Sequence, residues 1–140
     1  MTHHSIPIRI YYEDTDAGGI VYHAGYIRFG ERARTEFLRH IGYSSSQVQE
    51  DFNLLFVVKH IEIEYHAPAR LDDLLRIDTA VKAVKNTSFV MTHTIVKPEN
   101  GKDIPIATLD VVLVCVDSHA IKPVRFPQDI REKFEQYIDK

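Results

Sequence analysis

Three carboxylates, two adjacent glycines and a histidine lie within the stretch from Tyr11 to His23, which reads Tyr-Tyr-Glu-Asp-Thr-Asp-Ala-Gly-Gly-Ile-Val-Tyr-His. The stretch leads into the start of a predicted helix. Free backbone N–H groups at a helix start favour negative charge, including the charge that builds on a carbonyl oxygen under attack. A carboxylate facing such donors can attack the carbonyl or activate a water. The stretch therefore predicts a site for acyl transfer.

The elements on either side of this stretch are predicted from their apolar periods. Residues 6–12 alternate apolar and polar side chains, which predicts a strand that leads the chain to Glu13. From Tyr22 to Ile41 apolar residues recur at steps of three and four, which predicts a long helix ended by Gly42. Its apolar face comprises Tyr26, Phe29, Ala33, Phe37 and Ile41. Its charged face includes Arg28, Glu31, Arg32, Arg34, Glu36 and Arg39.

The rest of the chain is predicted to be mostly strand. Strands are expected at 54–66, 74–84, 88–96 and 105–117, with a capped helical turn at 44–51 and a terminal helix at 130–138. Short polar connections at 85–87 and 99–102 are typical of antiparallel hairpins. The pattern is α+β and predicts a single domain over residues 1–140. Because one helix cannot cover both faces of a twisted sheet, a second copy is expected to complete the sheet or its exposed edge.

Charge and composition exclude several classes of protein. The net charge of the 140-residue chain is −3, so no bulk positive field attracts nucleic acid and we expect no nucleic-acid partner. No apolar run is long enough to cross a bilayer, and residues 1–7 lack the features of a signal peptide, so a cytoplasmic location is expected. The single cysteine, Cys115, lies in an apolar run and is expected to be a buried, unreactive thiol.

Three segments carry a resemblance to a known family: Tyr11–His23, the helical sequence Glu-Arg-Ala-Arg-Thr-Glu at 31–36, and Tyr-His-Ala-Pro-Ala-Arg-Leu-Asp-Asp at 65–73. Together they resemble the hotdog-fold acyl-CoA thioesterases of the 4-hydroxybenzoyl-CoA thioesterase family, and most closely the Tol-Pal system-associated acyl-CoA thioesterase group. The resemblance covers nearly the whole chain. It implies a five-stranded antiparallel sheet wrapped around the long helix, an acyl-CoA substrate without a separate cofactor, and a homodimer or homotetramer with interfacial active sites.

The same resemblance implies which residues form the site. The family's catalytic aspartate corresponds to Asp16, and its carbonyl-polarising backbone N–H corresponds to that of His23 at the predicted helix start. Asp16 would either attack the thioester carbonyl or activate a water, and both routes stay open. The His23 side chain is a candidate to bind the thioester or orient water, and Tyr12 or Tyr22 to shape the pocket. For Glu13 and Asp14 we expect loop capping or a solvent-facing charge.

Coenzyme A carries phosphates, so the basic residues Lys59, Arg70, Lys82 and Lys85 are candidates to bind them. The resemblance implies that the pantetheine arm runs along strand edges. The predicted CoA-binding residues are therefore Val58, Lys59, Lys85, Asn86, Thr87 and Ser88. The acyl pocket would involve Tyr26, Phe29, Phe56 and Val57 with their partners across the subunit interface. Short aliphatic, longer fatty and aromatic acyl groups all stay open.

Metal and serine sites are disfavoured by residue spacing. Asp14-x-Asp16-x-Gly18 begins like a calcium loop, but the twelfth position of that loop would be Gly25, where a bidentate Glu is required. The eight histidines form neither His-Glu-x-x-His nor a Cys/His cluster, so no metal site is predicted and strand histidines are expected to be structural. Residues 44–46 are serines without the Gly-x-Ser-x-Gly setting of a hydrolase nucleophile.

The residues disfavour two rival assignments on the same fold and leave a third open. Some thioesterases of this fold place the catalytic carboxylate on the central helix, which makes Glu31 a rival of Asp16. We expect Glu31 to pair with Arg34 instead, and Arg32 with Glu36. An enoyl-CoA hydratase would carry a His five residues after its Asp, whereas residue 21 is Val. A non-catalytic module that binds acyl-CoA without using Asp16 stays open.

The resemblance also implies an association with the cell envelope. A peripheral position at the inner membrane and an acyl carrier protein partner are therefore open alternatives to a purely cytoplasmic protein. The terminal helix around Phe134 and Tyr137 would supply the contact. Packing of that helix against its own sheet is the favoured interpretation.

Overall fold

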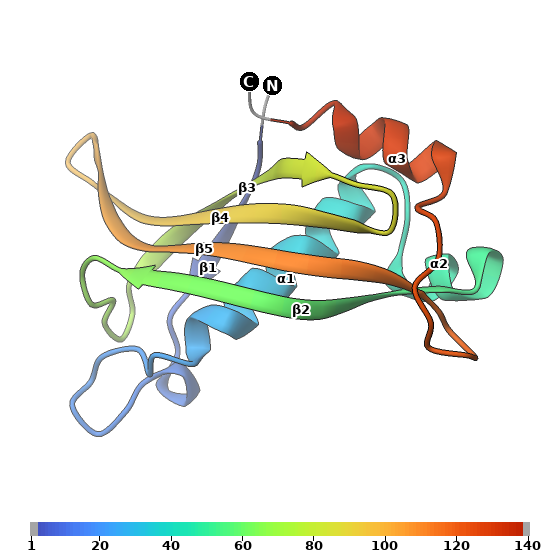
Figure 1. The fold of residues 1–140 in the computed structure, drawn as a ribbon. Helices are drawn as coiled ribbons and strands as arrows, with labels where there is room; N and C mark the ends of the chain where they lie inside the picture. The colour runs from blue at the N-terminus through green and yellow to red at the C-terminus, as the bar shows by residue number, and fades with distance from the viewer. Residues whose placement is uncertain (1–2, 139–140) are drawn as a thin grey trace.

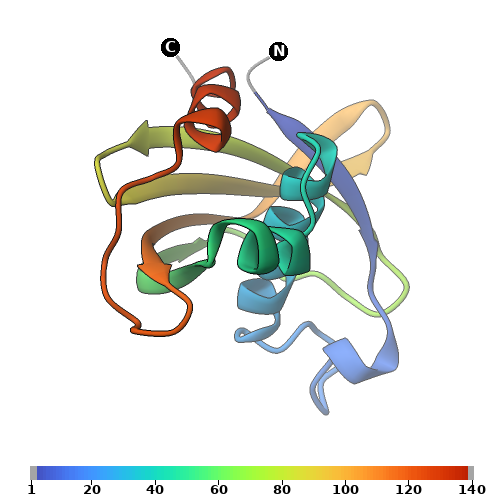
Figure 2. The ribbon, with the colours of Figure 1, turned by 90° about the vertical axis from the view of Figure 1, so that its right-hand side faces the viewer.

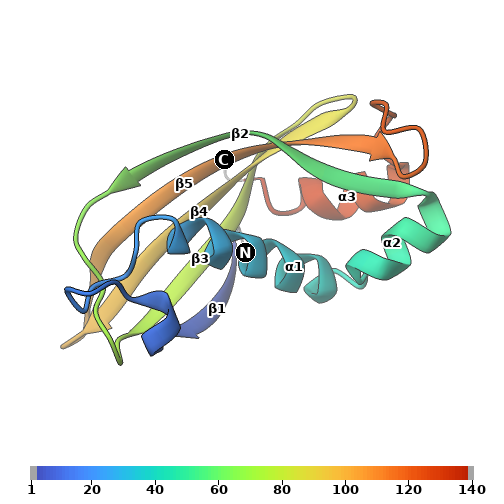
Figure 3. The ribbon, with the colours of Figure 1, turned by 90° about the horizontal axis from the view of Figure 1, so that it is seen from below.

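The computed structural model describes residues 3–138, which form a curved antiparallel sheet with a long helix along its concave face (Figure 1; Figure 3). The strands are β1 (His4–Arg9), β2 (Leu54–Tyr65), β3 (Leu74–Val84), β4 (Ser88–Glu99) and β5 (Lys102–Asp117). The helices are α1 (Gly25–His40), α2 (Ser45–Phe52) and α3 (Gln128–Glu135). The α+β prediction and the five-stranded sheet around a long central helix are confirmed.

The sheet has the strand order β1-β3-β4-β5-β2, so β2 lies at one edge and β1 at the other. β2 does not pair with its successor β3 but runs antiparallel to β5. Strands β4 and β5 are longer than predicted and meet at Asn100 and Gly101, whose φ angles are 52° and 77°. This left-handed pair closes a two-residue hairpin, so the ladder continues to the turn.

Helix α1 starts at Gly25, three residues later than predicted from Tyr22. Residues 22–24 form a turn instead, in which the Gly25 N–H donates to the Tyr22 carbonyl over 2.8 Å. The helix ends at His40, and Gly42 takes a φ of 106°, which confirms the predicted stop. The predicted apolar face is buried in full, with Phe29, Ala33 and Phe37 almost inaccessible to solvent.

Helices α2 and α3 lie at the same end of the molecule, where α3 packs against β3 (Figure 2). Ile130 and Phe134 of α3 are buried, and the Phe134 ring contacts those of Phe37, Phe89 and Phe126. Each such buried side chain contributes about 2 to 3 kcal/mol. The favoured interpretation of the terminal helix, packing against its own sheet, is therefore confirmed.

The structure also agrees with the predictions for Cys115 and for the helical turn at 44–51. Cys115 is fully buried, and burial raises the pKa of its thiol to about 12, so it is unreactive as predicted. The Ser44 hydroxyl accepts a hydrogen bond from the Gln47 N–H and caps α2, as predicted. None of the helices within residues 3–138 is both long and apolar enough to span a bilayer.

Candidate active site

The loop between β1 and α1 is organised by Asp14, whose side chain is only 4% exposed. One carboxylate oxygen accepts a hydrogen bond from the Tyr11 N–H over 2.9 Å, and the other lies 3.5 Å from Nη2 of Arg28. These contacts close a short 3-10 turn over Tyr12–Asp14. The capping role predicted for Asp14 is confirmed, and the alternative of a solvent-facing charge is wrong for this residue.

Asp16 lies at the exposed start of a tight turn. Its N–H donates to the Ile20 carbonyl over 2.9 Å, and its Oδ1 accepts from the Gly18 N–H over 2.8 Å. Gly19 has a φ of 79°, a conformation that favours glycine, and a Cβ on Gly18 would lie 3.3 Å from the carboxylate and displace it. Within residues 3–138 only Oδ1 of the carboxylate accepts a hydrogen bond, which leaves Oδ2 available for chemistry.

Tyr22 and His23 are exposed and follow this turn directly. Their rings lie 4.4 Å apart, and the Tyr22 N–H donates to the Asp14 carbonyl. The His23 carbonyl accepts from the Tyr65 hydroxyl over 3.2 Å, whereas its backbone N–H has no acceptor in the described part of the chain. Because α1 begins only at Gly25, this free donor precedes the first helical turn, at the positive end of the helix dipole.

A second loop holds this one in place. The Ala69 carbonyl accepts from the Val21 N–H, and the Ala69 N–H donates to the Tyr26 hydroxyl over 3.3 Å. The Leu71 N–H donates to the Gly19 carbonyl. Residues 65–73 were part of the sequence resemblance, but their role as the support of the Asp16 turn was not predicted. No sequence signal gives this role, because the contacts are made by backbone groups of Val21, Ala69 and Leu71.

The predicted CoA-binding residues lie in two places. Lys85, Asn86 and Thr87 form the turn between β3 and β4, and all three carbonyls accept hydrogen bonds: from Nη1 of Arg131 and from the N–H groups of Phe126 and Cys115. The turn is thus held by the C-terminal segment. Val58 is 45% exposed on the edge strand β2. Lys59 follows it at a bulge, where the pairing with β5 shifts register.

A single chain does not bring the predicted CoA-binding residues close to the loop of Asp16. Val57 and Ser88 both lie opposite Val114 of β5, so they share one row of the sheet. Tyr65, which touches His23, lies eight residues farther along β2, a separation of roughly 25 Å. Accordingly, the loop of Asp16 and the turn of Lys85 occupy opposite ends of the molecule (Figure 1).

The remaining predicted charged residues differ in whether they form ion pairs. Lys82 lies 3.0 Å from Asp110 on a different strand and is therefore not a free cation. Glu36 pairs with Arg39, so the predicted pair with Arg32 is wrong. Glu31 has no cation within ion-pair distance among residues 3–138, so its predicted pair with Arg34 is wrong as well. No three His, Cys, Asp or Glu side chains of the described residues converge as metal ligands.

A cavity of about 290 Å³ lies between α1 and the first half of β2. Its lining is mainly apolar and includes Leu38, Leu54, Phe56, Val58, Met91 and Leu113. Arg34 was predicted on the charged outer face of α1, but it also lines this cavity, where its Nη1 lies 3.3 Å from Nε2 of the buried His93. Sequence reasoning missed this pair because the apolar period assigns a face to the backbone position and not to the tip of a long side chain.

Comparisons with known proteins agree with this architecture. The family model "Thioesterase-like superfamily" matches residues 11–134. The acyl-CoA thioester hydrolase YbgC of Escherichia coli is 47% identical over 130 residues, covering 93% of this chain and 94% of that protein. The acyl-CoA thioesterase YbgC of Haemophilus influenzae is 42% identical, covering 93% of each chain.

A solved structure of 4-hydroxybenzoyl-CoA thioesterase in complex with 4-hydroxybenzoyl-CoA superposes with a TM-score of 0.89, covering 96% of this chain and 99% of that one. At 21% identity this likeness establishes the fold, which is the predicted hotdog fold. The model match covers the Asp16 turn, α1 and the whole of strands β2–β5. The chain belongs to the thioesterase-like superfamily.

Proposed function

We propose that this protein hydrolyses the thioester of acyl-CoA to a free carboxylic acid and CoA. The observation that carries the proposal is the free backbone N–H of His23, which lies at the positive end of α1 on the same loop as the exposed carboxylate of Asp16. Both YbgC relatives, of Escherichia coli and Haemophilus influenzae, are named for this activity and match over nearly the whole chain.

The chemistry follows from these two groups. The thioester carbonyl oxygen would accept a hydrogen bond from the His23 N–H, which stabilises the developing negative charge by about 3 kcal/mol. Asp16 then either attacks the carbonyl carbon, giving an anhydride that water cleaves, or removes a proton from an attacking water. CoA leaves as the thiolate and takes up a proton. The His23 imidazole and the Tyr22 ring flank the approach of the substrate.

We propose further that each site is shared between two copies of the chain. The outer side of β2 carries no strand among residues 3–138, although this edge is twelve residues long and exposes Val57 and Val58. Antiparallel pairing of β2 with itself about Ile61 would place Val57 of one copy opposite Tyr65 of the other.

This pairing would bring together the two parts of the site that lie far apart in a single chain. It would bring Val58, Lys59 and the turn Lys85–Ser88 of one copy toward Asp16, Tyr22 and His23 of the second. Lys59 and Lys85 then supply positive charge for the CoA phosphates, and the exposed side chains of the turn line the pantetheine arm. Coenzyme A is part of the substrate, and no separate cofactor enters the mechanism.

Whether two such dimers form a tetramer is measurable by light scattering, and a monomer would exclude the shared site.

The test of the activity is the variant Asp16→Asn, assayed with a chain-length panel of acyl-CoAs. We expect turnover to fall at least about hundredfold, because the variant has neither a nucleophile nor a base. Glu13→Gln is the matched control, since it removes an exposed carboxylate from the same loop. Undiminished turnover in Asp16→Asn would exclude the mechanism. Tight binding of acyl-CoA without turnover by the unmodified protein would favour the alternative, a non-catalytic acyl-CoA-binding module.

We place the protein in the cytoplasm, where a reducing environment suits its single thiol. The open alternative is a peripheral position at the inner membrane or on an acyl carrier protein. Because Ile130 and Phe134 of α3 are buried in the core, a contact with the membrane or a carrier protein would have to use another surface. Sedimentation of the protein with anionic vesicles separates the two locations.

A further inference from the structure

Arg34 is a cation in a mainly apolar cavity. Arg34 is partly buried and lines the space between α1 and β2 together with Leu38, Phe56 and Met91. Among residues 3–138 no carboxylate lies within ion-pair distance of its guanidinium. Its only hydrogen bond to a described residue joins Nη1 to Nε2 of His93. An arginine has five N–H donors, so most of them remain available to a ligand in the cavity.

The guanidinium is held in place by a chain of contacts under α1. Nε2 of His93 accepts from Arg34, which assigns the proton to Nδ1, 2.9 Å from the hydroxyl of Thr79. Burial and the nearby Arg34 charge lower the pKa of His93 to about 3, so the ring stays neutral and keeps its acceptor. Gly30 lies beside this pair, where a Cβ would be 3.4 Å from both Nη1 of Arg34 and the His93 ring.

The cavity lies where the acyl group would enter. It opens beside Val58 on the free edge of β2. In the antiparallel pair of chains proposed above, this point faces Tyr65 and the adjoining His23 of the second copy. A thioester held by the His23 N–H of one copy would therefore direct its acyl group into the cavity of the other. At about 30 Å³ for a water-sized group, 290 Å³ accommodates roughly ten non-hydrogen atoms.

We infer that Arg34 is a specificity-determining residue, which selects acyl groups that carry an oxygen acceptor, above all a carboxylate, at the end distant from the thioester. This inference rests on the proposed function. A hydrocarbon tail would leave the guanidinium desolvated and unpaired, whereas a terminal carboxylate would accept two parallel hydrogen bonds from it. A six-carbon diacid has nine non-hydrogen atoms in its acyl group, which matches the cavity.

Glu31 gives the inference an internal control. Its carboxylate lines the same cavity one helical turn before Arg34, and its charge raises the pKa of Arg34 against the lowering by burial. It would repel an incoming carboxylate but not an uncharged tail. Removal of the Glu31 charge and removal of the Arg34 charge should therefore shift selectivity in opposite directions.

The experiment compares adipoyl-CoA, 6-hydroxyhexanoyl-CoA and hexanoyl-CoA as substrates. The measured quantity is the ratio of kcat/KM for each oxygen-bearing substrate to that for hexanoyl-CoA. We expect Arg34→Met to lower the adipoyl ratio at least tenfold and the hydroxyhexanoyl ratio less, because a carboxylate gains more from the charge. Glu31→Gln should raise the adipoyl ratio severalfold. Arg39→Met, an exposed arginine of the same helix paired with Glu36, is the matched control and should leave both ratios unchanged.

Failure of this inference is distinguishable from failure of the proposed function. If Arg34→Met folds with the thermal transition of the unmodified protein and keeps its ratios, the inference is overturned while thioester hydrolysis stands. If the unmodified protein hydrolyses neither these three substrates nor any member of the chain-length panel, the activity is wrong, and calorimetric binding of the three compounds to the Asp16→Asn protein then measures the selectivity directly. Turnover of other acyl-CoAs but of none of these three would overturn the inference alone. Equal affinities with and without Arg34 in that background would overturn the inference.

Discussion

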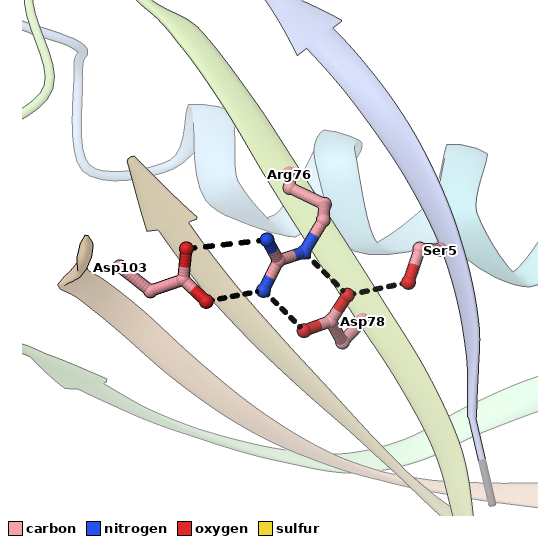
Figure 4. A network of polar contacts seen from close by, with 4 residues as sticks. All are labelled: Ser5, Arg76, Asp78 and Asp103. Carbon is pink, nitrogen blue, oxygen red and sulfur yellow. Dashed lines mark hydrogen bonds and ion pairs between the residues drawn. The ribbon is translucent and has the colours of Figure 1, made fainter. Parts of the chain in front are cut away.

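Two arginines on opposite faces of the sheet show how differently one side chain can be used. Arg76 lies on the outer face and donates four hydrogen bonds, two to Asp78 and two to Asp103, while Ser5 donates to Asp78 as well (Figure 4). Hydrogen bonds to these carboxylates raise its pKa. Arg34 lies on the α1 face, donates one hydrogen bond to a neutral ring, and has its pKa lowered by burial.

The difference in hydrogen bonding distinguishes an arginine with a structural role from one that is available to a ligand. Arg76 joins β3 to the start of β5 and has its donors occupied by the protein, so it needs nothing from outside. Arg34 differs, since its charge is partly removed from water and forms no ion pair within residues 3–138. A fold that tolerates such a charge loses stability there, which is typical of positions kept for function.

The largest expected effect comes from His93, which orients Arg34. In the unfolded chain this residue takes a proton below its ordinary pKa of 6.5, whereas the buried ring resists protonation until about 3, with Arg34 lowering and Asp110 raising that value. The unfolded state thus binds more protons, so the free energy of unfolding falls as the pH drops from 6.5 toward 3. By pH 4 the loss reaches about 3 kcal/mol from this group alone.

Urea unfolding at pH 7, 5.5 and 4 measures this loss. The variant His93→Gln keeps a polar side chain but cannot titrate, so its stability should fall less with acid than that of the unmodified protein. Asp78 contributes to both proteins alike, because hydrogen bonds from Arg76 and Ser5 outweigh burial and lower the pKa of its carboxyl, which gives stability that is lost on protonation. Asp110 contributes almost alike, because hydrogen bonds from Thr92 and Lys82 lower its pKa more than the His93 charge does. If the free energy of unfolding depends equally on pH in the two proteins, His93 takes up a proton in the native state as it does in the unfolded chain, and the ring is not buried as a neutral acceptor.

A smaller effect is expected on the outer face. Arg76→Met removes the four hydrogen bonds and leaves Asp78 and Asp103 without their shared cation. Since the arginine side chain is 35% exposed, solvent screens the pair, and we expect a loss of about 1 to 2 kcal/mol. Urea unfolding in low and in 1 M NaCl tests the assignment. The loss should shrink in salt, and a loss independent of salt would point to packing of the arginine stem instead.

Sequence periodicity predicted most of the fold, because alternation and helical steps report which residues face a core. It placed Phe29, Ala33 and Phe37 on the buried face of α1 and ended that helix correctly before Gly42. It could not locate the helix start, because the first turn is fixed by hydrogen bonds of Tyr22 with Asp14 and Gly25 rather than by a capping side chain.

The candidate site was less accessible to the same reasoning. Asp16, Tyr22 and His23 share one short stretch, so their proximity could be predicted from the chain alone. The separation of this stretch from Lys85–Ser88 depends on β2 crossing to the far edge beside β5, which no local pattern records. Arg34 was assigned to the charged face of α1 because the apolar period places its backbone position there, whereas its contact with His93 of β4 exists only in the packed fold.

The smallest expected effect is the most direct test of the comparison between the two arginines. In Arg34→Met the Nε2 of His93 loses its donor, which costs about 1 kcal/mol. The same change removes a charge from a cavity lined by Leu38, Phe56 and Met91, where an apolar side chain of similar length packs well and offsets that cost. The free energy of unfolding should therefore change by less than about 1 kcal/mol, and less than in Arg76→Met. If Arg34→Met proves the more destabilising of the two, Arg34 is a structural ion like Arg76, and a change in substrate selectivity would then report a distorted cavity rather than a lost contact with the acyl group.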